Sequence, residues 1–397
     1  MKTKHAVYLG ELDFPVGLAA VQRCRWLCKA LVETGFRTTV LIHFGTHNPQ
    51  TTPGLASMGE WDGIRYLYTG GMPYKPRTWA GRFAGLTSGL VKEAAELVRL
   101  KRETGLEFGI LSTAGVFQAV FYAILARWLR FPLLFNYVEL YSAFENRTSM
   151  PNRIGDASYD KLIPRLVDGF LPISDYLIEI LERRAPGRPY LKVPVVCDMQ
   201  SGPAIPPPRG RPYFLFCGSA LYFDAVEFVL SSFNRLEAYN ADLILVLNGQ
   251  DGPMARIAAA IERCPRKSRV RVRSRLSDTE LASAYAGASG LLIPLKPSLR
   301  DRARFPHKIG EYAASGNPII STAYGEIPHY FEDGESAFIA KANDPELFAE
   351  KMKLVLENPE FAQEVGRAGR RVGLKHFDYR KYGPLIADFA ASLKRRG

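Results

Sequence analysis

The feature that most constrains the fold is a repeated alternation of short apolar runs with longer helical segments. The run HAVYL at residues 5–9 is followed by the glycine-containing loop GELDFPVG, a helical segment over about residues 18–33 and a second apolar run at residues 38–43. A strand, a crossover helix and a second strand of about this length make a βαβ unit. The opening of the chain therefore predicts parallel strands joined by helices.

The same alternation continues on both sides of one Pro-rich segment, SGPAIPPPRG at residues 201–210. Before it we expect further strands at 108–112, 132–138 and 170–173, with helices at 115–130 and 174–184. After it we expect strands at 213–217, 242–247, 270–272, 290–294 and 318–322, with helices at 225–239 and 278–286. This alternation predicts an α/β protein with two doubly wound domains.

The length of the chain also favours two domains, because 397 residues exceed the roughly 100–200 residues of a single domain. We expect an N-terminal domain over residues 1–199, a stiff linker over 200–212, a C-terminal domain over 213–375 and a closing helix over 376–397. Ligands of such sheets bind beyond the carboxyl ends of the strands. The predicted site therefore lies between the two domains.

The charge of the chain favours anionic partners. The formal net charge is +12, from 52 Lys and Arg against 40 Asp and Glu. Such a surplus suits phosphates, nucleic acid or an acidic membrane surface. No stacking motif or helix-turn-helix pattern supports nucleic acid, so we expect no nucleic-acid partner.

The composition indicates a cytoplasmic protein without a metal. The N-terminal apolar run is too short for a secretory signal, and no stretch reaches the ~18 apolar residues of a spanning helix. The chain has five cysteines and six histidines, and neither set shows metal-ligand spacing. No Asp-x-Asp pair is present either. We expect reduced, mostly buried thiols and no metal site.

One short segment, RFPHKIGEYAASGNP at residues 304–318, predicts a helix with unusual charges at its start. Pro306 suits a first helical turn and Gly316 a stop. Cations crowd the start, where each costs roughly 0.3–1 kcal/mol relative to the other end; they are Arg300, Arg302, Arg304, His307 and Lys308.

Two interpretations of this helix remain open. Lys308 and Glu311 could form an ordinary surface pair at i, i+3, worth roughly 0.2–0.5 kcal/mol. Alternatively, a bound anion could be shared by the cations and the free N–H groups of the first turn. Glu311, a turn further in, would then accept hydrogen bonds from two neighbouring hydroxyls. Phosphate at the helix start and ribose one turn along describe a nucleotide.

The stretch FPHKIGEYAASGNPIISTAYGEIPHYFEDGESAFI resembles the C-terminal signature of retaining glycosyltransferases of family 4, the glycosyl transferases group 1. Supporting pieces occur along most of the chain, including Asp168-Gly169-Phe170, Val193-Pro194 and Arg275-Leu276-Ser277-Asp278. The resemblance implies the GT-B fold, with two Rossmann-like domains facing a central cleft. It also implies that the closing helix crosses back to the N-terminal domain.

The resemblance assigns roles to individual residues. Glu311 would bind ribose hydroxyls, Lys308 and the backbone of residues 304–306 would face the diphosphate, and the loop 274–276 would frame the base. Gly17 would let the first domain's loop approach the donor, and the Gly325-Glu326 turn would pass near the sugar or the nucleotide. The implied catalytic residues are Glu139, Lys308 and Glu311. The implied donor-binding residues are Gly17, Gly218, Ser219, Ser274, Arg275, Leu276, Arg304, Phe305, Pro306, Lys308 and Glu311.

The sequence departs from the family pattern in three respects. Ala303 stands eight residues before Glu311, where a second Glu is common. Ser219 and Asp224 stand where Arg and Lys usually face the diphosphate; the cations around residues 300–308 could supply that charge instead. Glu139 follows the strand after which the family often has a polar pair. Glu139 would orient the acceptor hydroxyl or act as its base, or would be an ordinary solvated loop residue.

The resemblance implies a retaining, metal-independent transfer of a hexosyl-type sugar from a UDP- or GDP-sugar to an acceptor hydroxyl, in polysaccharide or glycolipid assembly. The nucleotide sugar is a co-substrate, and no further cofactor is expected. The alternatives are a sugar-nucleotide 2-epimerase or a non-catalytic sugar-nucleotide-binding subunit.

A basic, amphipathic segment bears on the acceptor. Residues 72–104 contain seven Lys and Arg against three Glu, with Trp79 and Phe83 at i, i+4 and Leu86 and Leu90 beyond them. Such a segment fits an anionic membrane surface, and a peripheral location at the inner face of the membrane would suit a lipid-linked acceptor. The alternative is an amphipathic helix packed on its own sheet.

Overall fold

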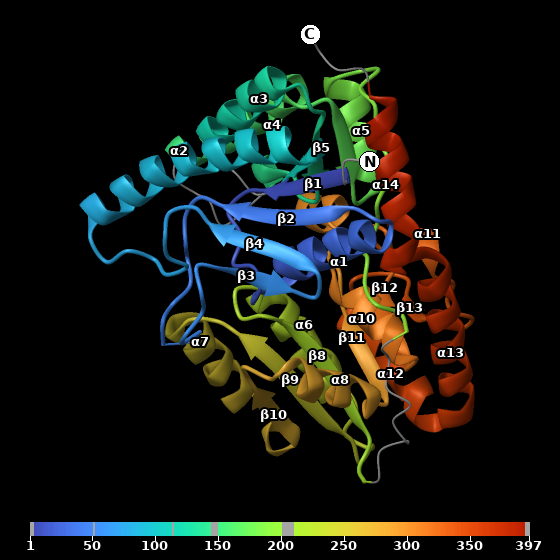
Figure 1. Cartoon of the computed structure of the whole chain (residues 1–397). Coiled ribbons are helices and arrows are strands. Elements are labelled where there is room, and N and C mark those ends of the chain that lie inside the picture. Colours follow the sequence, from blue (N-terminus) through green and yellow to red (C-terminus); the bar gives the residue numbers. More distant parts are fainter. Residues whose placement is uncertain (1–3, 51, 113–114, 144–149, 201–209, 394–397) are drawn as a thin grey trace. The chain divides into compact units, whose positions relative to one another are not determined.

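The computed structural model describes residues 4–50, 52–112, 115–143, 150–200 and 210–393 (Figure 1). The chain forms two compact units. The first comprises Met1–Val196 and Tyr379–Gly397, and the second Cys197–Asp378. Most of the predicted linker, residues 201–209, lies outside the described part of the chain.

The first unit contains a seven-stranded sheet in the order β3-β4-β2-β1-β5-β6-β7. All neighbouring strands are parallel except β3 and β4. These two form a hairpin whose turn residues, Asp62 and Gly63, have φ values of 51° and 80°. An Asp-Gly pair with two positive φ angles is the preferred two-residue hairpin turn. The strands are β1 (Lys4–Leu9), β2 (Arg37–Ile42), β3 (Met58–Trp61), β4 (Ile64–Tyr68), β5 (Gly105–Leu111), β6 (Leu133–Tyr137) and β7 (Gly169–Pro172).

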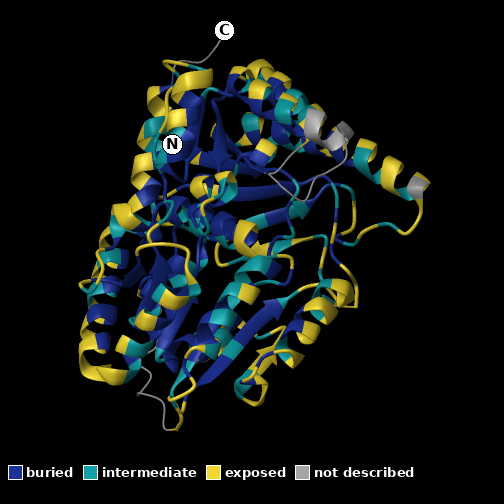
Figure 2. Ribbon diagram, turned by 180° about the vertical axis from the view of Figure 1, so that it is seen from behind, coloured by how far each residue is buried: buried dark blue, intermediate teal, exposed yellow. Residues whose placement is uncertain are grey.

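Helices cover this sheet and bury most of its strand residues, as the dark blue strands of Figure 2 show, whereas the edge strand β3 has no buried residue. Ser174 caps one of them by accepting a hydrogen bond from the Leu177 N–H at 3.2 Å, as its sequence position predicts. The helices are α1 (Ala19–Glu33), α2 (Trp79–Glu103), α3 (Val116–Leu129), α4 (Met150–Leu166), α5 (Asp175–Arg184) and α14 (Tyr382–Ser392), with 3-10 turns η1 (Tyr141–Ala143) and η3 (Tyr379–Lys381).

The last helix, α14, packs on α1 within the first unit. The ring of Tyr379, just ahead of α14, stacks on Trp26 with centroids 5.1 Å apart, and its hydroxyl donates to Glu33 at 2.5 Å. A Cβ atom at Gly383 would lie 2.2 Å from the Ala30 carbonyl oxygen. Only glycine therefore allows this approach of the two helices.

The second unit contains a six-stranded, fully parallel sheet in the order β10-β9-β8-β11-β12-β13. Its strands are β8 (Tyr213–Ser219), β9 (Asp242–Asn248), β10 (Val270–Arg273), β11 (Gly290–Ile293), β12 (Ile319–Thr322) and β13 (Phe338–Ala340). Its helices are α6 (Phe223–Asn234), α7 (Asp251–Glu262), α8 (Asp278–Ala286), α9 (Leu299–Ala303), α10 (Lys308–Ser315), α11 (Ile327–Tyr330), α12 (Pro345–Glu357) and α13 (Pro359–His376), with the 3-10 turn η2 (Lys267–Arg269).

The structure confirms the predicted α/β fold class, with two mostly parallel sheets. It corrects the start of the helix predicted within residues 304–318, which as α10 begins only at Lys308. The preceding helix α9 ends at Ala303, and Arg304 after it has an extended conformation (φ −92°, ψ 155°). Pro306 also disfavours a helical conformation at Phe305. The Pro306 carbonyl accepts the first hydrogen bond of the next turn from the Ile309 N–H at 3.1 Å. Gly316 ends α10 with φ 74°, as predicted.

Candidate functional site

The predicted donor residues of the second unit gather at one edge of its sheet. Ser219 is the last residue of β8, and the loop of residues 274–276 follows β10. Helix α9 and the segment leading to α10 follow β11. Because all six strands are parallel, these carboxyl ends lie at the same edge, where ligands of doubly wound sheets bind.

Lys308 and Glu311 form the centre of this edge. The Lys308 Nζ donates to Glu311 Oε2 at 2.7 Å, and the Tyr285 hydroxyl from α8 donates to the same oxygen at 3.0 Å. The other oxygen, Oε1, lies 4.0 Å from His307 Nε2. Both partners of the ion pair are mostly buried but keep an exposed fraction, 28% for Lys308 and 21% for Glu311. They can therefore be reached by a ligand.

Burial and charge compete at this pair. Burial opposes ionisation of Glu311, but the nearby Lys308 and His307 charges and the hydrogen bonds outweigh it and lower the pKa of Glu311. Burial likewise opposes the charge of Lys308, and Glu311 outweighs it and raises the pKa of Lys308. Both groups are therefore charged around neutral pH.

Two tyrosines hold α10 against the sheet. The Tyr312 hydroxyl accepts from the Cys217 N–H of β8 at 3.0 Å, and its ring packs edge-on against Tyr285 with centroids 5.2 Å apart. Tyr312 is fully buried. The pair fixes the rotation of α10, so that Lys308 and Glu311 stay at the carboxyl edge while Ile309 and Ala313 face the core.

Two carboxylates pair with cations ahead of α10, a role that the sequence did not predict for them. Buried Asp301 lies 2.8 Å from Arg304 Nη2 and 3.2 Å from Arg300 Nε. Asp224, at the start of α6, lies 2.7 Å from Lys296 Nζ and 3.6 Å from Arg300 Nη2. The cation crowd is therefore in part an intramolecular ion-pair network, and a bound anion is not its only explanation.

Arg304 keeps some capacity for a further partner. Its guanidinium lies over the ring of Tyr222, 4.6 Å from the centroid. Its Nε atom is buried without a hydrogen-bond partner among the described residues. A buried donor without an acceptor costs about 1–3 kcal/mol. An anion at this position would remove that cost.

The loop predicted to frame the base is anchored to the neighbouring strand. Arg275 has φ 55°, an uncommon value for a residue with a side chain, and its N–H donates to Asn248 Oδ1 at the end of β9 (3.1 Å). Its neighbours Ser274 and Leu276 are exposed and half-buried. The capping box of Ser277 and Glu280 then starts α8. The loop is thus shaped by its own backbone before any ligand binds.

Other predicted donor residues contribute through the backbone. Phe305 is buried and stacks on Tyr330 at 5.3 Å, so its side chain belongs to the core. Gly218 lies within β8, where a Cβ would meet the Phe216 ring at 3.1 Å. The Ser219 hydroxyl accepts from the Leu221 N–H at 3.3 Å and closes the turn into α6.

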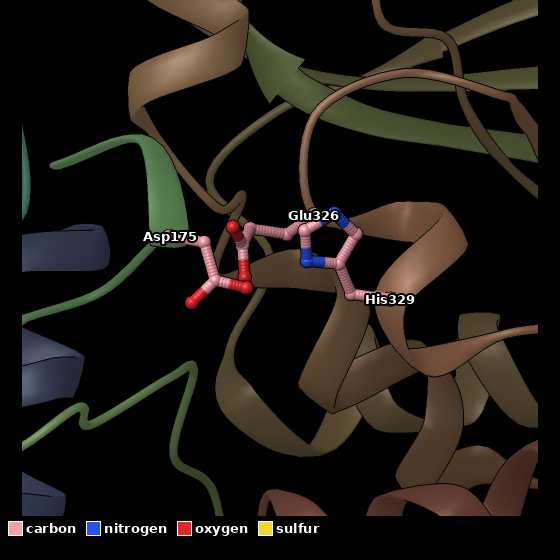
Figure 3. A group of neighbouring side chains, drawn as sticks. All are labelled: Asp175, Glu326 and His329. Carbon is pink, nitrogen blue, oxygen red and sulfur yellow. The ribbon is translucent and has the colours of Figure 1, made fainter. Parts of the chain in front are cut away.

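The turn at Gly325 and Glu326 precedes α11. Gly325 has φ 60°, and a Cβ there would lie 2.6 Å from the Asp301 carbonyl oxygen, so the turn packs directly on α9. Glu326 is buried and His329 lies one turn further on, as Figure 3 shows. Asp175, the third side chain drawn there, is the first residue of α5 in the first unit.

The remaining predicted site residues belong to the first unit. Gly17 precedes α1, and a Cβ there would lie 2.4 Å from Val21 Cγ2. Glu139 follows β6 and is half-buried. Both therefore follow the carboxyl ends of strands, as expected for ligand-contacting loops.

The second unit carries the decisive family match. Residues 202–372 match the family described as glycosyl transferases group 1. The second unit therefore resembles the group 1 glycosyl transferases over most of its length. The matched segment contains Lys308 and Glu311 together with every predicted donor residue of the second unit. Neither an epimerase nor a non-catalytic binding subunit is favoured by this match.

Solved structures of similar fold cover nearly the whole chain. Sucrose-phosphate synthase from Thermosynechococcus elongatus has a TM-score of 0.76 at 16% identity, covering 98% of this chain and 100% of its own. HepE from Anabaena in complex with UDP-glucose has a TM-score of 0.71 at 13% identity, covering 98% and 100%. A glycosyltransferase from Rickettsia africae has a TM-score of 0.70 at 11% identity, covering 98% and 99%. These likenesses show the GT-B fold. No curated protein sequence matches the chain significantly.

Three residues with structural parts in this candidate site were not among the predicted ones. Tyr285 binds Glu311, Tyr312 fixes α10 and Asp301 neutralises two arginines. The sequence offered one signal for Asp301: Ser298 stands three residues before it, and the Ser298 hydroxyl caps α9 by accepting from the Asp301 N–H at 3.2 Å.

Proposed function

We propose that the protein transfers a sugar from a nucleoside-diphosphate sugar to an acceptor hydroxyl, with retention of anomeric configuration and without a metal ion. The observation that carries the proposal is the Lys308–Glu311 pair at the carboxyl edge of the sheet, inside the segment that matches group 1 glycosyl transferases. Structures titled as HepE complexes with UDP and with UDP-glucose support a nucleotide-sugar donor.

The geometry around Glu311 suits a ribose. Lys308 and Tyr285 both donate to Oε2, which leaves Oε1 to accept hydrogen bonds from a ligand. Two neighbouring ribose hydroxyls match such a fixed carboxylate, and hydrogen bonds to a charged acceptor are worth about 1.5–3 kcal/mol. In this role Lys308 positions Glu311 and adds positive charge beside the diphosphate.

Transfer requires stabilisation of the leaving diphosphate. Donors that are fixed before the reaction and aimed at developing charge supply several kcal/mol of barrier lowering. The first N–H groups of α10, Lys308 and the buried Nε of Arg304 are such donors. Asp301 and Asp224 hold the arginines in place but also reduce the net positive charge around them. The N–H groups at the start of α10 therefore supply a larger share of the stabilisation of the diphosphate.

On the acceptor side, Glu139 would orient the attacking hydroxyl or take its proton. Retention follows if this hydroxyl attacks from the face that the diphosphate leaves. The anomeric configuration of the product, read by NMR, decides this point, and an inverted product would contradict it. Activity that depends on added divalent cations would contradict metal independence.

The donor site is tested by thermal denaturation with UDP, GDP, ADP and their sugars, using wild type and Glu311→Gln. A ligand at 100 times its Kd stabilises the protein by about 2.7 kcal/mol. We expect wild type to be stabilised by one nucleotide family. Glu311→Gln should bind that nucleotide at least tenfold more weakly, because a charged hydrogen-bond acceptor is lost.

Glu364→Gln is the matched control, because Glu364 is an exposed carboxylate on α13 of the same unit. This control should retain wild-type affinity. Equal binding by Glu311→Gln and wild type would overturn the ribose assignment. Absence of stabilisation by every nucleotide would overturn the proposed function itself.

We further infer that the acceptor is presented at an anionic membrane surface. None of residues 80–88, in the first turns of α2, is buried, whereas Leu97 and Leu100 later in the helix are. The helix therefore packs on the sheet only through its second half and extends outward through its first (Figure 1). Phe83 is 59% exposed and Val91 70% exposed. Among the described residues, no helix has the length and apolarity to cross a bilayer.

The adjacent helix α3 adds to this surface. It exposes apolar side chains at the helical spacing i, i+7, i+11, namely Phe117, Ile124 and Trp128, the last 65% exposed. Exposed basic residues lie along and before α2; these are Lys75, Arg77, Arg82, Lys92 and Arg102. Apolar side chains flanked by cations suit the headgroup region of an anionic bilayer.

A further inference from the structure

The first unit contains a buried polar cluster at the carboxyl edge of its sheet, which the proposed roles of Gly17 and Glu139 do not use. His43 directly follows β2, and Glu11 lies just beyond β1, the neighbouring strand. Glu93 comes from α2 and Tyr122 from α3. His43, Glu93 and Tyr122 are almost fully buried, whereas the Glu11 side chain is 40% exposed. The cluster thus joins the core to a surface carboxylate.

The contacts form a chain that ends at Glu11. Tyr122 donates its hydroxyl to Glu93 Oε2 at 3.0 Å, and that hydroxyl lies 2.9 Å from His43 Nδ1, which fits a donating imidazole nitrogen. His43 Nδ1 also lies 3.6 Å from Glu93 Oε2. On its other side, His43 Nε2 lies 3.6 Å from Glu11 Oε1. The Gln118 side-chain amide donates to the same Glu11 oxygen at 3.1 Å.

One atom of this polar cluster lacks a hydrogen-bond partner. His43 Nε2 is buried and makes no hydrogen bond with the described residues, and its ring has no solvent exposure. A donor that is buried and aimed at a carboxylate 3.6 Å away would be satisfied if Glu11 moved slightly toward it. Burial alone would lower the pKa of His43, but Glu11 and Glu93 outweigh it and raise that pKa to about 9, so the ring is an imidazolium at neutral pH.

We propose that Glu11 is an acceptor-binding residue: its carboxylate, oriented by His43 and Gln118, accepts hydrogen bonds from hydroxyls of the acceptor sugar. His43, Glu93 and Tyr122 are positioning residues that act through Glu11. The assignment rests on the proposed function, because it concerns the acceptor of the same transfer. Glu11 Oε1 is taken by the protein, and Oε2 has no partner among the described residues.

The charge of this edge selects the acceptor class. Glu11 and Glu93 together carry one more negative charge than His43 balances, and Asp13 lies in the same loop as Glu11. A local negative charge suits the hydroxyls of a neutral sugar or the ammonium of an amino sugar. It repels the phosphate of a sugar phosphate. The inferred acceptor is therefore not phosphorylated at the part that meets Glu11.

The test measures acceptor-stimulated release of nucleotide from the donor that stabilises the wild-type protein. The acceptor probes are methyl α- and β-glycosides of glucose, galactose, mannose and glucosamine, with glucose 6-phosphate as the charged comparison. We expect a neutral or amino sugar to stimulate release and glucose 6-phosphate not to. In Glu11→Gln, the KM for the best probe should rise at least tenfold, while the Kd of the nucleotide stays within twofold of wild type.

Two further variants separate positioning from folding. Tyr122→Phe keeps the ring and removes only the hydroxyl that joins His43 to Glu93, and its acceptor KM should rise more than its kcat falls. Glu107→Gln, an exposed carboxylate on β5, should behave as wild type. An unchanged acceptor KM in Glu11→Gln would overturn the proposal, as would preferred stimulation by glucose 6-phosphate or none by any sugar. A wild-type protein that binds no nucleotide would instead overturn the proposed function.

Discussion

Two buried histidines of the first unit show how neighbouring charges decide a residue's behaviour. His5 is 4% exposed and His43 fully buried, so burial disfavours the charged form of both. For His5, burial and the nearby Arg65 and Arg37 lower the pKa to about 4. For His43, Glu11 and Glu93 reverse the effect of burial and raise the pKa to about 9. The sequence places both residues on or beside strands but does not say which carboxylates face them.

These opposite shifts predict a stability maximum of the first unit near pH 6.5. The raised pKa of His43 stabilises the folded state below pH 6.5, and that stabilisation is lost as pH rises toward 9. The lowered pKa of His5 has the opposite effect on stability, which is lost as pH falls from 6.5 toward 4. His43→Gln should flatten the alkaline limb, which is worth up to about 3 kcal/mol, and His5→Gln the acid limb. Melting temperatures across pH 4–10 test this, and an alkaline limb that persists in His43→Gln would contradict it.

At the scale of elements, close helix contacts depend on single glycines. Gly383 places α14 directly on the Ala30 carbonyl of α1, and a Cβ would also lie 2.2 Å from Thr34 Oγ1. Gly252, in α7 of the second unit, has nothing within 4 Å of an added Cβ. The same substitution therefore meets backbone at one site and open space at the other.

Gly383→Ala should destabilise the first unit by about 1–3 kcal/mol, because overpacking forces the helices apart. Gly252→Ala should stabilise the second unit by up to about 1 kcal/mol, because alanine has the higher helix propensity. Denaturant unfolding of both variants, followed by circular dichroism, compares the two. Equal effects of the two substitutions would show that the α1–α14 contact is not as close as described.

At the scale of the whole molecule, the cations behind the net charge of +12 have different surroundings in the two units. In the second unit, Asp301, Asp224 and Glu311 balance many of the cations near the donor edge. In the first unit, the exposed cations before and along α2 accompany exposed apolar side chains. The paired cations of the second unit position the candidate donor site, and the exposed cations of the first unit suit contact with an anionic surface.

The double variant Phe83→Ser, Val91→Ser should lose flotation with vesicles of phosphatidylglycerol and phosphatidylcholine. Wild type should float, and binding should fall as salt rises, because exposed cations are screened. Leu374→Ser removes a similarly apolar, partly exposed residue from α13 of the second unit and should float as wild type does. Flotation that is independent of anionic lipid would contradict the inferred membrane surface.

Much of the fold followed from local sequence patterns. The runs at residues 5–9, 242–247 and 290–294 form strands β1, β9 and β11, as their short length and flanking turn residues predict, and Gly316 ends a helix because it adopts a positive φ. The β3–β4 hairpin was not predicted, although the Asp62-Gly63 pair is its signal. Helices α7, α12 and α13 were not predicted as elements either. Their amphipathic patterns indicate helices clearly only when the sheet that their apolar faces cover is known.

For the candidate site, the sequence alone determined the residue types and their spacing: a cation and a carboxylate three residues apart on one helix, within a family signature. That much is local, because the helical period alone makes Lys308 and Glu311 neighbours. Only the tertiary structure decided that Tyr285 shares Glu311, that Asp224 faces Arg300, and that Glu11 lies beside His43. These partners are 26, 76 and 32 positions apart in the chain. Each pair comes together only when the parallel strands of its own sheet place the following loops and helices at one edge, because a hydrogen bond or an ion pair needs a contact that spacing along the chain does not provide.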